Sequence, residues 1–292
     1  MSRIAYVNGR YVRHAEAAVH IEDRGYQFAD GVYEVCEVRG GRLIDETLHI
    51  DRLERSLGEL RIAMPMSRAA LGAVLRETVR RNGVRDGMVY LQVTRGVAPR
   101  NHPFPAPDTA PGIVVTAKSV APSLGDKRAE AGIAVISVPD NRWERVDIKT
   151  VGLLPNVMAK QAAKEAGAYE AWFVDKDGNV TEGSSTNAWI VTADGTLVTR
   201  PANGGILRGI TRTVILELAA KHGLKVEERA FSLDEAKRAR EAFITAATTL
   251  VMPVVKIDEA VIGNGAPGSI AADLRARFHQ HAETAPRWSR GC

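Results

Sequence analysis

Two lysines lie in apolar stretches of sequence that could make their side-chain amines reactive. Lys149 stands in Val-Asp-Ile-Lys-Thr-Val-Gly-Leu-Leu, and Lys256 stands in Pro-Val-Val-Lys-Ile-Asp. Burial among apolar groups favours the neutral amine, which is the form that attacks a carbonyl carbon to make a Schiff base. Lys256 fits the water-facing position of a hairpin strand. Lys149 taken alone fits an exposed strand end, so the rest of the chain must decide its role.

Polar and glycine residues gather in two runs of the C-terminal half. Residues 180–190 read Val-Thr-Glu-Gly-Ser-Ser-Thr-Asn-Ala-Trp-Ile, and residues 205–212 read Gly-Ile-Leu-Arg-Gly-Ile-Thr-Arg. The second run opens an amphipathic helical pattern, so the amides of Ile210 and Thr211 are expected at a helix N-terminus, where anions bind favourably. Glu182 taken alone fits a solvated residue beside a hairpin turn.

A proline-rich loop carries a basic pair. Residues 98–107 read Ala-Pro-Arg-Asn-His-Pro-Phe-Pro-Ala-Pro, a composition that excludes a helix or a central strand. In an extended segment, residues two apart project to the same side, so Arg100 and His102 can converge on one carboxylate. Without other motifs the loop would be interpreted as a rigid surface connection.

Hydrophobic patterning divides the chain into short strands and amphipathic helices. Hairpins are expected at residues 4–13 and 33–44, with turns at Asn8-Gly9 and Gly40-Gly41. Further strands are expected at 88–94, 113–117, 133–138, 171–174, 187–191, 242–245 and 254–257, and helices near 50–60, 71–79, 157–166, 209–222, 232–235 and 269–281. Strands and helices do not alternate strictly, so the pattern predicts two mixed α/β domains, an α+β fold, rather than a doubly wound sheet.

A candidate domain boundary follows the last strand of the N-terminal group. Residues 118–127 read Lys-Ser-Val-Ala-Pro-Ser-Leu-Gly-Asp-Lys, a composition typical of a linker. We therefore expect an N-terminal α/β domain over residues 1–120, an interdomain linker over 121–126 and a C-terminal α/β domain over 127–292. Lys149 falls in the C-terminal domain under this division.

Composition narrows the function classes. Of the 292 residues, 45% are hydrophobic and 25% are charged, which is typical of an ordinary globular protein. The net charge of +4 is small, the basic residues are scattered and aromatics make up 5%, so no nucleic-acid binding is expected. Cys36 and Cys292 are too few for a disulfide framework or a cysteine zinc site, and we expect no metal. The N-terminus lacks the apolar core of a signal peptide and no apolar run could cross a bilayer, so we expect a cytoplasmic protein.

Taken together, the motifs resemble those of the class IV, pyridoxal-phosphate-dependent aminotransferases. The signature of that family is Glu-x-Ser-x-x-Asn followed by a hydrophobic pair and then a spaced Gly-Ile-Thr-Arg, and it matches residues 182–189 and 209–212. Within the family the chain is most similar to the D-amino acid (D-alanine) transaminases, through residues 23–34, 49–53, 99–102 and 147–149. The resemblance runs from about residue 4 to near 257. Dispersed motifs in the right order are more specific than any one of them.

The resemblance implies fold type IV, in which the active site lies at the domain interface and binds pyridoxal 5'-phosphate. Lys149 would form the internal aldimine with the cofactor and then carry the proton between the substrate carbon and the cofactor. Glu182 would pair with the pyridine nitrogen and keep it protonated, so that the ring can take up the electrons of the carbanion. The 5'-phosphate would be bound by the amides of Ile210 and Thr211 and by Arg52, which taken alone would be interpreted as a surface arginine.

The resemblance also implies a substrate site. Tyr33 from the second hairpin would bind the substrate α-carboxylate together with Arg100 and His102. In the family this loop reaches the active site of the neighbouring subunit, which implies a homodimer. The remaining charged residues of this region are expected to form structural ion pairs or loop anchors: Arg24, Asp30 and Glu34.

Two positions depart from the family pattern. Trp189 stands where Phe or Tyr is usual, which changes the packing beneath the cofactor. Ala247 stands in the second phosphate-binding loop where a hydroxyl is usual. The Ala247 amide could still donate to the phosphate, and the Thr248 hydroxyl could compensate.

The expected activity is transfer of the amino group of D-alanine to 2-oxoglutarate, giving pyruvate and D-glutamate in ping-pong half-reactions. One rival is an L-branched-chain aminotransferase on the same scaffold, and Arg100 and His102 favour the D enzyme over it. A second rival is 4-amino-4-deoxychorismate lyase, in which the same electron sink drives elimination of pyruvate. A third is a non-catalytic relative that has lost the cofactor, against which Lys149 and Glu182 argue. The expected partners are small amino acids and 2-oxo acids, and no membrane partner is expected.

Overall fold

The computed structural model describes residues 3–286, which form two compact units. The first unit contains residues 3–122, 148–152 and 283–286, and the second contains residues 123–147 and 153–282. Each unit has its own hydrophobic core, so each is described by itself. Cys292, which the sequence singled out, lies outside the described residues.

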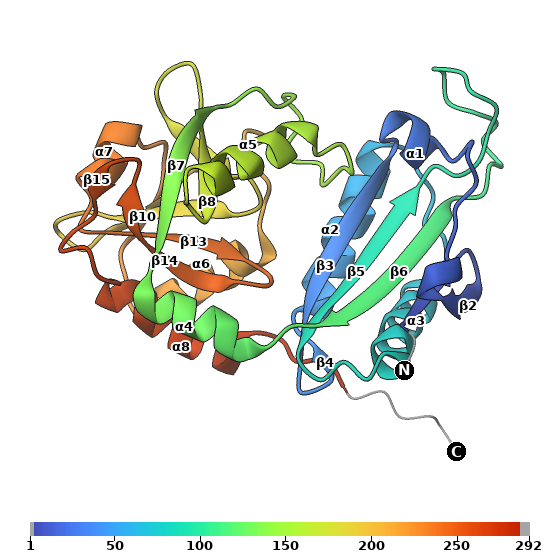
Figure 1. The fold of residues 1–292 in the computed structure, drawn as a ribbon, viewed down its shortest axis with the longest axis horizontal. Coiled ribbons are helices and arrows are strands. Elements are labelled where there is room, and N and C mark those ends of the chain that lie inside the picture. Colours follow the sequence, from blue (N-terminus) through green and yellow to red (C-terminus); the bar gives the residue numbers. More distant parts are fainter. Residues whose placement is uncertain (1–2, 287–292) are drawn as a thin grey trace. The chain divides into compact units, whose positions relative to one another are not determined.

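An antiparallel sheet forms the first unit, with helices against one of its faces (Figure 1). The strand order is β2-β1-β6-β5-β3-β4, and the long helices α2 and α3 pack on this sheet. The elements are β1 (Ile4–Val7), β2 (Arg10–Arg13), the 3-10 turn η1 (His14–Glu16), α1 (Arg24–Phe28), β3 (Gly31–Arg39), β4 (Arg42–Leu43), α2 (Glu46–Glu59), α3 (Arg68–Arg81), β5 (Gly87–Thr94) and β6 (Gly112–Ser119).

Tight turns close the two hairpins that the sequence predicts. The first turns at Asn8 and Gly9, with φ of 44° and 92°, and the second turns at Gly40 and Gly41, with φ of 57° and 77°. Positive φ at both central residues matches the right-handed twist of the flanking strands, and Asn and Gly tolerate it best. Both predicted hairpins are confirmed.

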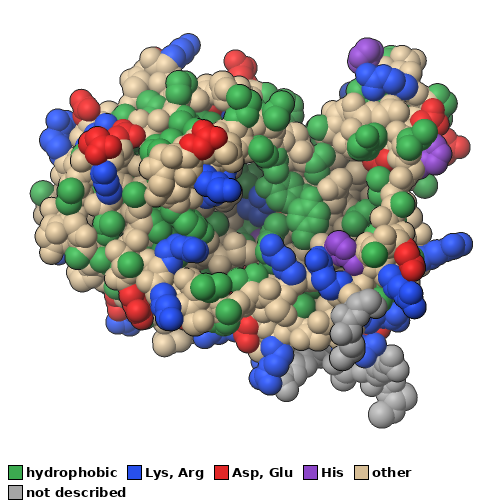
Figure 2. Space-filling view, viewed as in Figure 1, with side chains coloured by type: hydrophobic (Ala, Val, Ile, Leu, Met, Phe, Trp, Pro, Cys, Tyr) green, Lys and Arg blue, Asp and Glu red, His purple; other side chains and the backbone are tan. Residues whose placement is uncertain are grey.

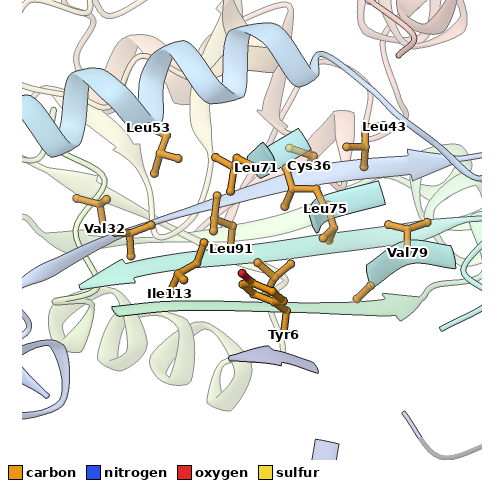
Figure 3. Packing of buried hydrophobic residues seen from close by; sticks show 14 of the residues in the cluster. Tyr6, Val32, Cys36, Leu43, Leu53, Leu71, Leu75, Val79, Leu91 and Ile113 are labelled. Carbon is orange, nitrogen blue, oxygen red and sulfur yellow. The ribbon is translucent and has the colours of Figure 1, made fainter. Parts of the chain in front are cut away.

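Apolar side chains from helices and sheet interdigitate in the core of the first unit (Figure 3). Leu53 of α2 and Leu71 and Leu75 of α3 pack in one cluster with Val32 of β3 and Leu91 of β5, and each is at most 3% exposed. Burying a leucine side chain of this kind contributes roughly 1.5–3 kcal/mol relative to leaving it exposed. The core therefore holds α2 and α3 firmly on one face of the sheet.

Strand β3 places residues of different character on the two faces of that sheet. Its buried positions alternate, so that Val32, Glu34 and Cys36 face the helices while Tyr33 and Val35 lie on the opposite face. One strand thus presents a carboxylate to α2 and an aromatic ring to the other side.

The segment that carries Lys149 pairs with β3. Val32 and Thr150 form an antiparallel bridge, and the Tyr33 amide donates to the Lys149 carbonyl at 3.0 Å. Ile148 is buried in the core of the first unit. The expected division put Lys149 in the C-terminal domain, whereas the segment belongs with residues 3–122, because β3 satisfies its backbone groups and the first core buries its isoleucine.

A mixed sheet forms the second unit. Its strand order is β12-β11-β10-β13-β14-β7-β8-β9, with β15 paired to β14, and β7 is parallel to both β8 and β14. The elements are α4 (Pro122–Ala131), β7 (Ile133–Pro139), α5 (Leu154–Glu165), β8 (Glu170–Val174), β9 (Val180–Gly183), β10 (Asn187–Val191), β11 (Leu197–Thr199), α6 (Ile210–Lys221), β12 (Val226–Glu228), α7 (Leu233–Lys237), β13 (Glu241–Ala246), β14 (Leu250–Ile257), β15 (Ala260–Val261) and α8 (Ser269–His281).

The ends of the expected domains also differ from the observed units. Part of the stretch expected as a linker, residues 121–126, belongs to helix α4, because Pro122 is compatible with the first turn of a helix. At the other end, the chain returns to the first unit after α8. The Asp45 amide donates to the Glu283 carbonyl at 2.8 Å, and the Ala285 amide donates to the Leu43 carbonyl at 2.9 Å.

Charged side chains of both signs are distributed over the surface. Figure 2 shows lysines and arginines interspersed with acidic and apolar side chains on the visible face. Within residues 3–286, none of the helices combines the length and the apolar character needed to span a membrane. The described residues also contain no cluster of histidine, cysteine and acidic side chains that could hold a metal ion.

Candidate active site

Lys149 and Tyr33 form the first part of the candidate site. The Lys149 Nζ lies 4.1 Å from the centroid of the Tyr33 ring, and that ring stacks on Tyr90 with centroids 5.7 Å apart. The pairing of residues 148–152 with β3 sets this arrangement, because a backbone hydrogen bond joins Tyr33 to Lys149. The structure therefore brings the predicted amine and the predicted tyrosine together.

Tyr90 and Gln92 of β5 extend the same polar surface, although no motif singled them out. Gln92 pairs with Tyr33 across the two strands, and the Tyr90 hydroxyl donates to Gln92 Oε1 at 2.7 Å. Burial raises the pKa of Tyr90 to about 12, so its hydroxyl stays protonated at neutral pH. The sequence signal that could have found them is their spacing, because residues two positions apart on a strand place both side chains on one face.

Arg52 ends in a buried ion pair on β3. Its Nε and Nη2 donate to the two carboxylate oxygens of Glu34, each at 2.8 Å, and Glu34 Oε2 lies 2.7 Å from His49 Nδ1. The side chains of Arg52, Glu34 and His49 are 9%, 3% and 3% exposed. Arg52 is therefore no surface arginine, because the turn of α2 that carries it faces the sheet.

Pairing offsets the cost of burying these charges. Burial acts to raise the pKa of Glu34, but the Arg52 guanidinium and the His49 hydrogen bond hold it well below its usual range. Burial lowers the pKa of His49, so its imidazole is neutral at neutral pH. The cluster thus contains one fixed anion, one fixed cation and one neutral donor.

Glu182 lies buried on β9 with donors on both carboxylate oxygens. Arg142 Nη1 donates to Oε1 at 2.6 Å, and Asn187 Nδ2 and the Leu207 amide donate to Oε2 at 3.0 and 3.2 Å. Charge-assisted hydrogen bonds of this kind favour the ionised carboxylate. The interpretation of Glu182 alone as a solvated turn residue is wrong, because strand β9, which the pattern did not predict, buries it.

Arg142 is a candidate that sequence patterns did not single out. Its side chain is 5% exposed, and its Nε and Nη2 donate to the two oxygens of Asp140 at 2.9 and 2.8 Å. Burial acts to lower the pKa of Arg142, but Asp140 and Glu182 outweigh it and raise that pKa. Arg142 stands outside any periodic segment, so only the fold reveals that it pairs with Glu182.

Helix α6 begins at the predicted anion site. Its cap residue is Gly209, and no described side chain caps its first turn. The first amides of a helix have no partner within the helix, so those of Ile210 and Thr211 can bind a phosphate. Arg212 from the same motif is 2% exposed and donates to the Arg200 carbonyl at 2.9 Å, which makes it an anchor of the helix.

Gly209→Ala is expected to destabilise the protein and to displace Asn187. A Cβ at position 209 would stand 2.0 Å from Asn187 Oδ1, and Asn187 cannot shift without loosening its bond to Glu182. Overpacking of this kind costs about 1–3 kcal/mol, to be measured by urea unfolding. Gly58→Ala on α2 is the control, because no atom lies within 4 Å of the added Cβ. A wild-type unfolding midpoint for Gly209→Ala would contradict the prediction.

The turn between β13 and β14 contains the position that departs from the family pattern. Ala247 is half-buried and Thr248 is exposed. Within this turn, the hydroxyl that is buried without a hydrogen-bond partner in the described residues belongs to Thr249 and not to Thr248, the residue expected to compensate. In the neighbouring strand β10, Trp189 is fully buried and its Nε1 donates to Thr245 Oγ1 at 3.0 Å.

Arg100 and His102 lie exposed on the loop between β5 and β6. Arg24 anchors this loop by donating to the carbonyls of Asn101 and His102 at 2.6 and 3.2 Å, as expected of a loop anchor. The Arg100 guanidinium lies 4.6 Å from the centroid of the Phe28 ring, and the His102 ring lies 5.6 Å from it. In the described chain, Arg100 and His102 thus contact Phe28 of α1 and not Lys149, the predicted amine.

The chain matches the family model described as amino-transferase class IV over residues 31–257. It is 45% identical over 268 residues to a D-alanine aminotransferase of Bacillus licheniformis, covering 92% of this chain and 93% of that protein. A D-alanine aminotransferase of Staphylococcus haemolyticus is 38% identical over 279 residues, covering 96% of this chain and 98% of that protein.

Among solved structures, a T.th. branched-chain amino acid aminotransferase with pyridoxamine 5'-phosphate superposes with a TM-score of 0.87 at 26% identity. The match covers 96% of this chain and 94% of that one. Sequence similarity over nearly the whole length is therefore higher to the D-alanine enzymes than to this structural neighbour. Shared fold alone does not decide the substrate, since one fold carries many activities.

Proposed function

The chain belongs to the class IV aminotransferases, and on this premise we propose that Lys149 is its catalytic amine. Its cofactor is pyridoxal 5'-phosphate, and its reaction is the transamination of D-amino acids. One observation carries the assignment of Lys149. Its amine contacts Tyr33, and the next residue of the same strand, Glu34, holds the buried cation Arg52.

The donor set of the chain fits this cofactor. An aldehyde requires an amine, a pyridinium nitrogen requires a carboxylate, and a phosphate requires a cation and N–H donors. The orphaned Thr249 hydroxyl offers a further donor. We propose that the residues that hold the cofactor are Lys149, Glu182 and Arg52, with the amides of Ile210, Thr211 and Ala247 and the hydroxyl of Thr249.

When bound, the cofactor withdraws electrons from the Cα–H bond of the amino acid and makes its proton removable. We propose that the Lys149 amine takes that proton and returns it, acting as general base and then as general acid. A single amine on one side delivers the proton to one face only, which fixes the configuration of the product. Glu182, whose carboxylate pairs with Arg142, would hold a proton at the pyridine nitrogen.

We propose that Tyr33, Arg100 and His102 bind the substrate α-carboxylate and that the protein acts as a homodimer. The support for a dimer is the position of the basic pair, whose contacts in the described chain are with Phe28 rather than with Lys149. A loop from a second copy would supply the missing cations. A guanidinium is suited to this role because it can donate two parallel hydrogen bonds to a carboxylate.

The proposed donor is D-alanine and the proposed acceptor is 2-oxoglutarate, which gives pyruvate and D-glutamate. The alternative is an L-branched-chain aminotransferase, favoured by the structural neighbour with pyridoxamine 5'-phosphate. The deciding assay is pyruvate release from D-alanine and from L-alanine with and without 2-oxoglutarate, with L-leucine as a second donor and 4-amino-4-deoxychorismate as a lyase substrate. Turnover of L-leucine without turnover of D-alanine would overturn the proposal.

Arg100→Ala is expected to raise the KM for D-alanine at least about tenfold, because it removes one or two charge-assisted hydrogen bonds worth roughly 1.5–3 kcal/mol each. The cofactor should remain bound, as its absorbance will report. Arg68→Ala is the control, since Arg68 forms an exposed ion pair with Glu54 and lies outside the proposed site. An unchanged KM for the Arg100 variant removes the basis for assigning the carboxylate to this loop.

We also propose a cytoplasmic location. The support is Cys36, a buried cysteine that forms no disulfide in the described residues. Unpaired thiols persist in reducing compartments, whereas secreted domains usually pair theirs.

A further inference from the structure

The carboxylate of Glu34 engages the proposed phosphate ligand in an arrangement that charge alone does not explain. Both of its oxygens accept from Arg52, from Nε and from Nη2, at 2.8 Å. His49 approaches the same carboxylate, with Nδ1 at 2.7 Å from Oε2. Water hardly reaches the three side chains, of which the most exposed is Arg52 at 9%.

A buried anion at this place opposes the binding of another anion. The cofactor phosphate is negatively charged, and the Glu34 carboxylate lies within hydrogen-bond distance of the cation proposed to bind it. By Coulomb's law, removing the carboxylate would strengthen phosphate binding, if charge were the only effect. An opposing benefit must therefore come from geometry.

The fork between Glu34 and Arg52 supplies such a benefit. Two parallel hydrogen bonds fix the plane and the direction of a guanidinium more firmly than one bond does. An arginine side chain that is not held in this way has many rotamers, and it loses part of that conformational entropy on binding a ligand. Because the bonds to Glu34 hold the guanidinium on β3, its plane and direction are set before the phosphate arrives.

His49 completes the arrangement from the same helix as Arg52. The two residues are three positions apart on α2 and therefore share one helix face. Because the Glu34 carboxylate is ionised and can only accept, the bond requires a proton on His49 Nδ1. The imidazole thus holds Oε2 in place without adding a second positive charge.

We propose that Glu34 and His49 are positioning residues that orient Arg52 toward the cofactor phosphate. This inference rests on the proposed function, which assigns the phosphate to Arg52. A structural role for the same pair, joining α2 to β3, would change protein stability without changing affinity for the cofactor. If Glu34 acted only through its negative charge, its removal would tighten cofactor binding, whereas the loss of positioning would weaken it.

The test is titration of the apo protein with pyridoxal 5'-phosphate, followed by absorbance, with inorganic phosphate as a competing probe. Glu34→Gln is expected to weaken cofactor binding about tenfold, and Arg52→Met to weaken it further. The double variant should bind no more weakly than Arg52→Met alone, because Glu34 acts through Arg52. At saturating cofactor the KM of Glu34→Gln for D-alanine should stay at the wild-type value.

Glu46→Gln is the matched control, since Glu46 lies on the same helix and pairs with Arg76 of α3. It should lower stability and leave cofactor affinity unchanged. Should Glu34→Gln fail to fold, His49→Phe decides, with a loss of affinity of about threefold expected for one hydrogen bond. Equal or tighter cofactor binding by the folded Glu34 variant, or by His49→Phe, overturns the inference. Wild-type binding by Arg52→Met would instead refute the phosphate assignment in the proposed function.

Discussion

Lys149→Ala is expected to lower kcat for D-alanine by at least about 10³-fold, because one amine is proposed both to attach the cofactor and to move the proton. The substitution removes a side chain that is half-buried, so the protein should still fold. Pyruvate release measures the loss. Borohydride reduction of the wild-type holoenzyme, followed by peptide mapping, should place the phosphopyridoxyl group on Lys149.

Lys256→Ala separates this expectation from a general effect of removing lysines. Lys256 lies in an apolar stretch of sequence as Lys149 does, but its amine pairs with Glu259 at 2.9 Å on the surface. The activity of Lys256→Ala should match that of the wild type. Added methylamine should restore part of the activity of Lys149→Ala, since a free amine can replace a proton carrier but not a purely structural residue. A label on Lys256, or full activity of Lys149→Ala, would refute the assignment.

Local chemistry is what made parts of the fold predictable. The turn at Asn8-Gly9 needs positive φ, which Asn and Gly adopt readily, and the resulting hairpin is observed. The helix expected at residues 269–281 is observed with these bounds. The helix expected near 232–235 is observed as α7, and the Ser232 hydroxyl caps it by accepting from the Glu235 amide at 3.0 Å. Each of these depends on residues within one or two turns of chain.

Long-range pairing was not predictable in the same way. The partner of Arg52 is 18 residues away on a strand, and no spacing rule joins an arginine of one helix to a carboxylate of one strand. Lys149 joins β3 because a five-residue segment, Ile148–Gly152, returns to the first unit. Composition can mark a linker along the chain, but it does not reveal such a return.

Candidate site residues were predictable as types but not as partners. The family resemblance supplied Lys149, Glu182 and Arg52, and the structure adds what holds two of them: Glu34 for Arg52 and Arg142 for Glu182. Arg142 lies in none of the motifs, and Glu34, which was expected to form a structural ion pair, had no partner assigned from the sequence. Their signal is a complementary charge at hydrogen-bond distance in a buried place, which only coordinates provide.

Glu182→Gln is expected to lower kcat for D-alanine by about 10- to 150-fold, the equivalent of one charge-assisted hydrogen bond of roughly 1.5–3 kcal/mol. The amide has nearly the shape of the carboxylate but carries no charge, so it cannot hold a proton at the pyridine nitrogen as an ion pair. The existing donors from Arg142 and Asn187 lie on the two carboxylate oxygens, and an amide nitrogen would oppose one of them. Steady-state kinetics with saturating cofactor measure the effect on kcat, separately from cofactor affinity.

Glu182→Asp distinguishes the loss of charge from the loss of packing. It keeps the negative charge that Arg142 neutralises, while shortening the side chain and weakening the bonds from Asn187 and the Leu207 amide. If the charge is what matters, the Asp variant should retain more kcat than the Gln variant, even though Gln preserves the shape better. If shape determines stability, urea unfolding should show that Glu182→Gln is more stable than Glu182→Asp. A kcat for Glu182→Gln equal to the wild type would show that the reaction does not depend on an anion at this position.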